Sequence, residues 1–369
     1  MKITVVTNTS WNIFNFRLPL LRELRKSGHD IYIIAPEDEY SEHLKVDFDE
    51  FHSIKISRKG YNPFKDFMFF WQLLDRYKKI RPDLTIHYTI KPNIYGSLAA
   101  FCTKVPTINN VTGLGTVFLH DNLGSKIAKL LYKISFKKSE LVFFQNPTDK
   151  ALFVDMGLCP KDVAGLVPGS GIDVDYFKQE RLNEQKVFTF AYVGRMLFDK
   201  GIIELIEAIK AFKIIGGKAK FIFAGQLETE AGLGIDLTVM NEWVEKGIIE
   251  YAGLVSDMKE FLKGIDCVIL PSYREGAPRA LLEAASMSIP LIATDVPGCR
   301  EVVINEENGI LCKPKNANSL LEALKKMVSL PLDKRLSMGK AGRKKVVECF
   351  SNKIVISKYQ TAISDLVKE

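Results

Sequence analysis

Residues 272–283 read Ser-Tyr-Arg-Glu-Gly-Ala-Pro-Arg-Ala-Leu-Leu-Glu and join two predicted elements of the fold. The apolar run 266–271 comes before them and indicates a buried strand, while residues 279–285 show a helical pattern. Gly276 lets a ligand approach the backbone closely, and Pro278 suits a first helical turn, where no amide donor is needed. The free N–H groups and the dipole of such a helix start favour an anion such as a phosphate.

Two carboxylates flank this turn. Glu275 lies at the mouth of the predicted helix, and Glu283 lies five residues into it, about 7 Å along the axis at the usual rise per residue. This spacing suits the two ends of one elongated polar ligand. The alternative is an ordinary solvated helix start that happens to carry two acidic residues.

The rest of the chain repeats the strand-then-helix pattern. A length of 369 residues predicts two domains, and 47% hydrophobic with 26% charged residues is an ordinary composition for a protein without membrane spans. Alternating strands and helices predict parallel sheets covered by helices, twice over. The ten expected strands are 2–7, 30–35, 84–88, 106–111, 141–145, 187–193, 219–224, 249–253, 266–270 and 290–294. Helical patterns include 16–27, 92–103 and 333–349, the last followed by another helix up to residue 369.

The expected domain boundaries follow from the same pattern. We expect an N-terminal domain at 1–168, a turn-rich and charged linker at 169–186, a C-terminal domain at 187–350 and a terminal helix at 351–369.

Several classes of protein are disfavoured. The longest apolar runs are too short for a transmembrane helix, and the apolar start is too short for a signal peptide. The six cysteines are scattered without a C-x-x-C pair, which predicts reduced core thiols, and the five histidines lack metal-binding spacing. No G-x-G-x-x-G follows the first strand and no P-loop occurs, which disfavours nicotinamide, flavin and P-loop chemistry.

A second cluster lies near the start of the second domain. Gly194 ends a predicted strand, and Arg195 and Lys200 follow in the next loop. Two cations at the carboxyl end of a strand, ahead of a helix, are what a diphosphate group requires. The alternative is that these two cations are ordinary exposed loop residues. It is disfavoured because Glu275 and Glu283 fall on the same edge of the sheet.

Three motifs together resemble a known family. G-R-x(4)-K-G at 194–201, P-S-x-x-E-G-x-P-x-x-x-L-E-A at 271–284 and P-L-I-A-T-D at 290–295 resemble the retaining nucleotide-sugar glycosyltransferases of family 4, which have the GT-B fold. The resemblance implies an α/β protein with two doubly wound Rossmann-like domains that face a central cleft. It also implies a C-terminal helix that crosses back to the N-terminal domain.

The family also implies roles for individual residues. Arg195 and Lys200 would bind the donor diphosphate, Glu275 would contact the hydroxyls of the donor sugar, and Glu283 would contact those of the ribose. We therefore expect Arg195, Lys200 and Glu275 to be catalytic. The other donor-binding residues implied by the resemblance, several of them through their backbone, are Gly194, Tyr251, Gly253, Gly276, Ala277 and Pro278.

The N-terminal half resembles bacterial enzymes that add a sugar to polyprenyl-diphosphate-linked saccharides, especially N-acetylgalactosaminyltransferases. Residues 14–20, 87–93 and 111–115 carry this likeness. Many members have a histidine, thought to touch the donor sugar, where this chain has Val111-Thr-Gly. The acceptor residues that we expect are Arg17 and Lys91, for a diphosphate, together with Thr112 and Gly113.

The chemistry follows from the cations. A nucleoside diphosphate gains negative charge as it leaves, and Arg195 and Lys200 can stabilise it without a proton transfer. We therefore expect no cofactor and no metal, the UDP-sugar being a substrate. A D-x-D sequence, Asp173 and Asp175, lies in the predicted linker and is interpreted as structural. Retention of the anomeric configuration suggests that the acceptor attacks from the face that the leaving group leaves. The alternative is that Glu275 acts as a covalent nucleophile.

The acceptor and the membrane are expected on the basic first domain, since residues 51–150 hold 16 Lys and Arg against 6 Asp and Glu. Lys126, Lys129 and Lys133 recur at helical spacing, opposite an apolar stripe of Ile127, Leu130, Leu131 and Ile134. Such a helix is a candidate for an anionic membrane surface, an ordinary surface helix being the alternative. Residues 64–80 are aromatic enough to lie partly in a membrane interface, but core packing is the preferred interpretation there.

These observations predict a retaining hexosyltransferase. We expect it to move a hexose or N-acetylhexosamine, N-acetylgalactosamine first among them, from a UDP-sugar to a polyprenyl-diphosphate-linked saccharide at the cytoplasmic face of the membrane. The alternatives are a UDP-sugar epimerase of the same architecture and a non-catalytic protein that binds nucleotide sugars or nucleic acid. Nucleic-acid binding is disfavoured because no aromatic residues interleave with basic ones on an expected exposed sheet.

Overall fold

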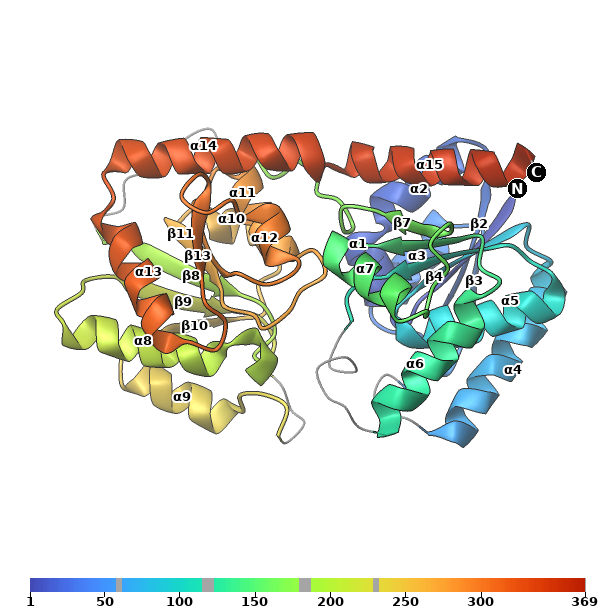
Figure 1. Ribbon diagram of the computed structural model, residues 1–369, viewed down its shortest axis with the longest axis horizontal. Coiled ribbons are helices and arrows are strands. Elements are labelled where there is room, and N and C mark those ends of the chain that lie inside the picture. The colour runs from blue at the N-terminus through green and yellow to red at the C-terminus, as the bar shows by residue number, and fades with distance from the viewer. Residues whose placement is uncertain (58–61, 115–122, 179–186, 228–231, 369) are drawn as a thin grey trace. The chain divides into compact units, whose positions relative to one another are not determined.

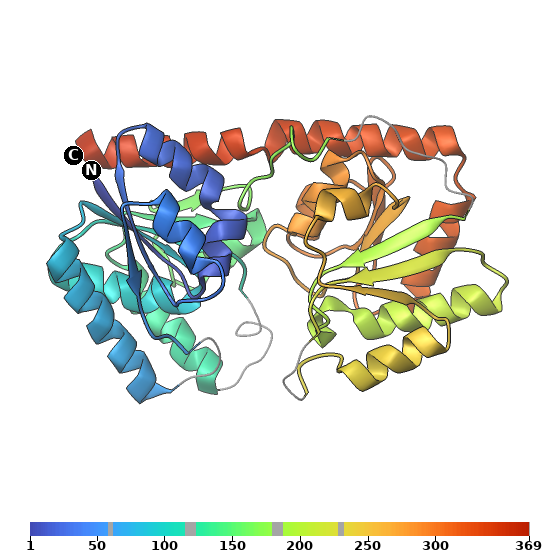
Figure 2. The same cartoon turned by 180° about the vertical axis from the view of Figure 1, so that it is seen from behind.

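The computed structural model describes residues 1–57, 62–114, 123–178, 187–227 and 232–368. The chain divides into two compact units. Unit 1 comprises Met1–Gly171 with Asn352–Glu369, and unit 2 comprises Ile172–Ser351. Each unit is a parallel sheet with helices on both faces (Figures 1 and 2).

Unit 1 has a seven-stranded sheet in the order β3-β2-β1-β4-β5-β6-β7. All neighbouring strands are parallel, so their carboxyl ends share one edge. The strands are β1 (Lys2–Val6), β2 (Asp30–Ala35), β3 (Glu50–Ser53), β4 (Leu84–Tyr88), β5 (Thr107–Val111), β6 (Leu141–Phe144) and β7 (Ala164–Leu166).

Helices cover both faces of this sheet (Figure 1). They are α1 (Ser10–Phe16), α2 (Leu18–Lys26), α3 (Ser41–Asp47), α4 (Pro63–Ile80), the π-helical turn η1 (Pro92–Gly96), α5 (Ser97–Thr103), α6 (Leu123–Phe136), α7 (Pro147–Asp155) and α15 (Asn352–Lys368). The C-terminal helix α15 packs beside α2 and adds Val355, Tyr359 and Ile363 to the core of unit 1. The expected return of a C-terminal helix to the N-terminal domain is therefore confirmed.

Unit 2 has a six-stranded parallel sheet in the order β10-β9-β8-β11-β12-β13. Its strands are β8 (Thr189–Val193), β9 (Lys220–Ala224), β10 (Glu250–Gly253), β11 (Cys267–Leu270), β12 (Leu291–Thr294) and β13 (Gly309–Cys312). Its helices are η3 (Phe198–Lys200), α8 (Ile202–Ile214), α9 (Leu237–Glu245), α10 (Met258–Leu262), α11 (Arg279–Ser286), α12 (Cys299–Val302), α13 (Ala317–Ser329) and α14 (Leu332–Cys349). Two doubly wound α/β units are thus confirmed.

The helix expected at 16–27 is confirmed as α2, which begins two residues later because Arg17, with a non-helical φ of −121°, separates it from α1. One expectation about local structure was wrong. Cys102 and Cys349 are exposed, whereas the other four cysteines are buried as expected. Both exposed cysteines lie on the outward side of a helix end, a position that flanking apolar residues do not reveal.

Candidate functional site

Three turns meet at the carboxyl edge of the unit 2 sheet, after β8, β11 and β12. The Glu275 amide donates to the Pro297 carbonyl at 3.1 Å, and the Tyr273 amide donates to the Asp199 carbonyl at 2.9 Å. The turn after β11 is therefore bonded to its neighbours on both sides. Short turns after adjacent parallel strands are brought together in this way because all the strands point in the same direction.

Lys200 and Glu275 form a partly buried ion pair in this edge. Lys200 Nζ lies 2.6 Å from Glu275 Oε1, and Ser272 Oγ donates to the same oxygen at 2.6 Å. The side chains are 22% and 14% exposed. Burial lowers the pKa of Lys200, but the charge and hydrogen bond of Glu275 outweigh it, so the pKa lies above its ordinary value. Lys200 is therefore a fixed cation whose position Glu275 determines.

Arg195 lies on the turn after β8 and is exposed. Its carbonyl accepts a hydrogen bond from the Tyr192 hydroxyl at 2.7 Å, which anchors the turn to a buried side chain. Sequence reasoning placed Arg195, Lys200 and Glu275 at one sheet edge, and the structure does the same. What it adds is that Lys200 and Glu275 bind each other in this state.

Two glycines that sequence reasoning missed allow these turns to approach so closely. A Cβ on Gly225 would lie 1.9 Å from the Gly194 carbonyl oxygen, and one on Gly298 would lie 2.5 Å from the Glu275 carbonyl oxygen. Both residues have positive φ, 141° and 87°. The site is therefore built backbone against backbone, which only glycine permits. Gly225 directly follows β9 and Gly298 lies in the turn after β12, and these positions were the available signal.

Glu283 lies on α11 and is 7% exposed. Arg279 Nε lies 2.6 Å from its Oε1, a pair at i,i+4 that the sequence spacing could have revealed. Burial raises the pKa of Glu283, and the charge and hydrogen bond of Arg279 only partly oppose this. Gly276, Ala277 and Pro278 form the preceding turn, and the amides of Leu281 and Leu282 donate to the Pro278 carbonyl.

Tyr251 and Gly253 lie at the end of β10, as expected. The Tyr251 hydroxyl donates to the Gly225 carbonyl at 2.7 Å, and the Gly225 amide donates to the Gly253 carbonyl at 2.8 Å. The end of β10 is thereby joined to the same edge of the sheet as Gly194.

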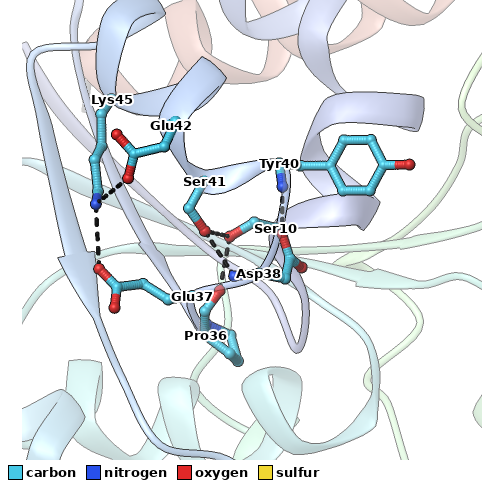
Figure 3. A network of polar contacts seen from close by, with 8 residues as sticks. All are labelled: Ser10, Pro36, Glu37, Asp38, Tyr40, Ser41, Glu42 and Lys45. Atoms are coloured by element: carbon cyan, nitrogen blue, oxygen red, sulfur yellow. Dashed lines mark hydrogen bonds and ion pairs between the residues drawn. The ribbon is translucent and has the colours of Figure 1, made fainter.

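The corresponding first turn of unit 1 is arranged differently (Figure 3). The Asp38 carboxylate accepts hydrogen bonds from the amides of Trp11 and Tyr40, both at 3.0 Å. Ser41 Oγ accepts from the Asp38 amide at 2.8 Å and donates to Ser10 Oγ, which donates to the Pro36 carbonyl (Figure 3). The start of α1 is therefore occupied by the chain's own carboxylate, in agreement with the missing G-x-G-x-x-G motif.

The acceptor residues expected in unit 1 lie at the carboxyl ends of its strands or near them. Thr112 and Gly113 directly follow β5. Lys91 Nζ lies 2.6 Å from Asp66 Oδ1 in a pair with 15% and 4% exposed side chains, so its charge is already matched. Arg17 is buried, with its guanidinium 4.1 Å from the centre of the Tyr88 ring.

The outward faces of α4 and α6 are more apolar than expected. On α6, Leu130 and Ile134 are exposed beside Lys126 and Lys133, so the apolar stripe is not buried in the core as the alternative of an ordinary surface helix requires. The buried side of α6 is formed instead by Ser125, Tyr132, Ser135 and Phe136. Lys129 is half-buried.

On α4, core packing holds for Phe69, Leu73, Leu74, Tyr77 and Ile80. Phe64, Phe67, Met68 and Trp71 are exposed at i, i+3, i+4 and i+7, which places them on one outward stripe. The general preference for core packing was therefore wrong for half of this helix, because an 18-residue helix on a sheet has an outward face whatever its composition.

The described residues form neither a metal cluster nor a membrane-spanning helix. Within the described ranges, no three His, Cys, Asp or Glu side chains gather as a metal site would require. Asp173 Oδ1 accepts from the amides of Asp175 and Tyr176 at 3.1 and 2.8 Å, which gives the D-x-D sequence a structural role in a turn. No described helix is long and apolar enough to cross a membrane.

Comparisons with known proteins agree with this architecture. Residues 2–146 match the glycosyl transferase 4-like family, and residues 173–345 match the glycosyl transferases group 1 family. Over the full length of both chains, the protein is 26% identical to the N,N'-diacetylbacillosaminyl-diphospho-undecaprenol alpha-1,3-N-acetylgalactosaminyltransferase of Campylobacter jejuni. It is 27% identical to the UDP-Gal:alpha-D-GlcNAc-diphosphoundecaprenol alpha-1,3-galactosyltransferase of Escherichia coli, over 79% of this chain and 77% of that one.

A solved structure shares the fold of the whole chain. A glycosyltransferase from Rickettsia africae superposes with a TM-score of 0.82 at 20% identity, covering 100% of this chain and 99% of the other.

Proposed function

Since the chain belongs to the glycosyltransferases, with a 4-like domain followed by a group 1 domain, we propose that it transfers a hexose or N-acetylhexosamine from a UDP-sugar to a polyprenyl-diphosphate-linked saccharide. N-acetylgalactosamine is the sugar that we propose first, because the Campylobacter relative carries that name. The observation that carries the proposal is the Lys200–Glu275 pair at the carboxyl edge of unit 2, where a parallel sheet binds its ligand.

The proposed mechanism rests on charge. As the glycosidic bond breaks, the UDP leaving group becomes more negative, and Lys200 and Arg195 stabilise that charge without transferring a proton. Lys200 needs no reorganisation because Glu275, itself held by Ser272, already fixes its position. We propose retention by front-face attack, in which the departing phosphate oxygen takes the proton of the acceptor hydroxyl. Because two cations stabilise the charge on the departing UDP, the proposed mechanism requires no metal ion.

Glu283 gives the proposed ribose contact a pH dependence. Ribose hydroxyls donate best to an ionised carboxylate, whereas burial raises the pKa of Glu283 in the free protein. UDP binding should therefore lower that pKa and release protons, so UDP affinity should fall as the pH is lowered through the raised pKa of Glu283. Calorimetry in buffers of different ionisation enthalpy measures both effects.

A matched ligand controls for other groups. The 2',3'-dideoxy analogue of UDP lacks both hydroxyls and should bind with much less proton release. Equal proton release for the two ligands would rule out Glu283 as the ribose contact.

We also propose that unit 1 docks on an anionic membrane surface, where a polyprenyl-linked acceptor resides. The apolar stripe of α4, formed by Phe64, Phe67, Met68 and Trp71, would enter the interface. Residues 123–138, which include α6, contain five lysines and no acidic residue, which suits anionic headgroups. The proposed place of work is the cytoplasmic face of the cell membrane.

Replacing both Phe67 and Trp71 by Ser should weaken binding to vesicles of anionic lipid about tenfold or more, because each buried aromatic side chain contributes roughly 1.5–3 kcal/mol. Co-sedimentation measures this. Replacing Lys126 and Lys133 by Gln should weaken it further, in a salt-dependent way. Ile214→Ser in unit 2, which also removes an exposed apolar side chain, is the control. Equal binding of all variants would contradict this surface.

The function itself is tested by transfer. The protein is incubated with a panel of labelled UDP-sugars and a polyprenyl-diphosphate saccharide, and the lipid phase is then extracted. Label should move into lipid for one donor. Release of free sugar into water alone would contradict the proposed acceptor, and conversion of one UDP-sugar into another would identify an epimerase.

A further inference from the structure

Among the described residues of unit 1, the cation Arg17 is buried and forms no ion pair. Arg17 is only 3% exposed, and its Nε is buried without a hydrogen-bond partner in the described part of the chain. Its guanidinium carbon lies over the face of the Tyr88 ring, 4.1 Å from the ring centre. A guanidinium remains protonated in any protein environment, so burial cannot be relieved by loss of a proton. An unpaired buried charge is unfavourable, and a bound anion would compensate it.

A second buried donor belongs to the same group of side chains. The Tyr88 hydroxyl donates to the Tyr359 hydroxyl at 3.0 Å, and Tyr359 donates to Asn110 Oδ1 at 2.6 Å. This fixes the orientation of the Asn110 amide, whose Nδ2 is buried and finds no partner among the described residues. Arg17 and Asn110 are thus linked through two tyrosines, one of them supplied by the C-terminal helix α15.

Thr89 is the third residue with an unpartnered donor, and its backbone is strained. It follows Tyr88 at the end of β4 and has a φ of +72°, which is costly for a β-branched residue. Its Oγ1 is also buried without a partner among the residues that the structure describes. Within the described ranges, these three donor groups therefore lack an acceptor, and Thr89 and Asn110 lie at the carboxyl ends of β4 and β5.

We propose that Arg17, Asn110 and Thr89 bind a phosphate group, and that this is a phosphate of the acceptor's diphosphate. The choice of ligand rests on the proposed function. The competing candidate in unit 1, Lys91, is already paired with Asp66, and the start of α1 is occupied by Asp38. The cations proposed for the donor diphosphate belong to unit 2, which leaves the acceptor as the source of an anion for Arg17.

Binding of inorganic pyrophosphate tests the site without requiring catalysis. The protein is first saturated with UDP so that the donor site is filled. Pyrophosphate should then raise the melting temperature of the wild type and of the control Arg22→Met, whose guanidinium is paired with Asp47 at the surface. Arg17→Met should bind pyrophosphate at least tenfold more weakly, while its melting temperature without ligand stays at or above that of the wild type.

A second variant guards against misfolding. Asn110→Asp keeps the acceptor for Tyr359 and brings a carboxylate to the unpaired donors. It should raise the melting temperature and abolish pyrophosphate binding. If Arg17→Met and Asn110→Asp both bind pyrophosphate as the wild type does, the site is overturned. If Arg17→Met instead loses several degrees of melting temperature and keeps its pyrophosphate affinity, Arg17 is a structural cation.

Steady-state kinetics and UDP binding show whether the phosphate bound by Arg17 belongs to the acceptor or to the donor. Arg17→Met should raise KM for the lipid-linked acceptor at least tenfold and leave KM for the UDP-sugar unchanged. Weaker UDP binding by this variant would assign the phosphate to the donor and overturn the acceptor assignment. If the wild type transfers no sugar to lipid but shows Arg17-dependent pyrophosphate binding, the proposed function fails and the anion site stands.

Discussion

Replacing Lys200 by Ala should lower kcat about 100-fold or more, because it removes a fixed cation from the leaving group. The ammonium is held 2.6 Å from Glu275 in a largely buried position, where charge is screened less than in water. The loss should appear in kcat more than in the donor KM, since charge on UDP grows towards the transition state. Steady-state kinetics with a saturating acceptor measures both constants.

A surface ion pair supplies the control for this variant. Lys246 pairs with Glu242 one turn away on the exposed side of unit 2, so Lys246→Ala should leave kcat within about twofold. Thermal unfolding should show that Lys200→Ala is folded, because Glu275 keeps its bond to Ser272. A kcat within threefold of the wild type would exclude Lys200 as the group that stabilises the diphosphate.

Replacing Gly225 by Ala should destabilise unit 2 by at least about 3 kcal/mol and abolish UDP binding. The new Cβ would meet the Gly194 carbonyl oxygen at 1.9 Å, and neither atom can move without shifting a strand end. Because Arg195 follows Gly194 directly, the shift would displace one of the two proposed cations. Urea unfolding and UDP calorimetry measure the two effects.

Gly216 is the matched control. It also has a positive φ, 83°, but a Cβ there would meet nothing within 4 Å. Gly216→Ala should cost only about 1 kcal/mol and leave UDP affinity unchanged. If the two variants were equally stable, the close approach of the turns after β8 and β9 would not be needed for the site.

Much of the fold could be predicted because a strand that is buried on both faces consists of a continuous run of apolar residues. All ten expected strands occur within two residues of their expected ends. The three strands that were missed, β3, β7 and β13, have three or four residues and each lies at the edge of its sheet. An edge strand pairs on one side only, so its sequence carries a weaker apolar signal.

The candidate site was predictable to the level of the sheet edge and no further. The succession of strands and helices places Lys200 and Glu275 on the same edge, but their ion pair depends on side-chain geometry across 75 positions of sequence. Burial of Arg17 depends in the same way on Tyr88 and Tyr359, which lie far from it in the chain. Contacts of this kind leave no local pattern in the sequence.

A crystal structure of the protein with UDP tests the central claim most directly. The account predicts diphosphate oxygens within about 2.7–3.2 Å of Lys200 Nζ and the Arg195 guanidinium, and ribose hydroxyls within the same range of Glu283. Gly276 and Ala277 should line the diphosphate through their backbone. A diphosphate bound elsewhere, with the Lys200–Glu275 pair untouched and Glu283 still bound only to Arg279, would contradict it.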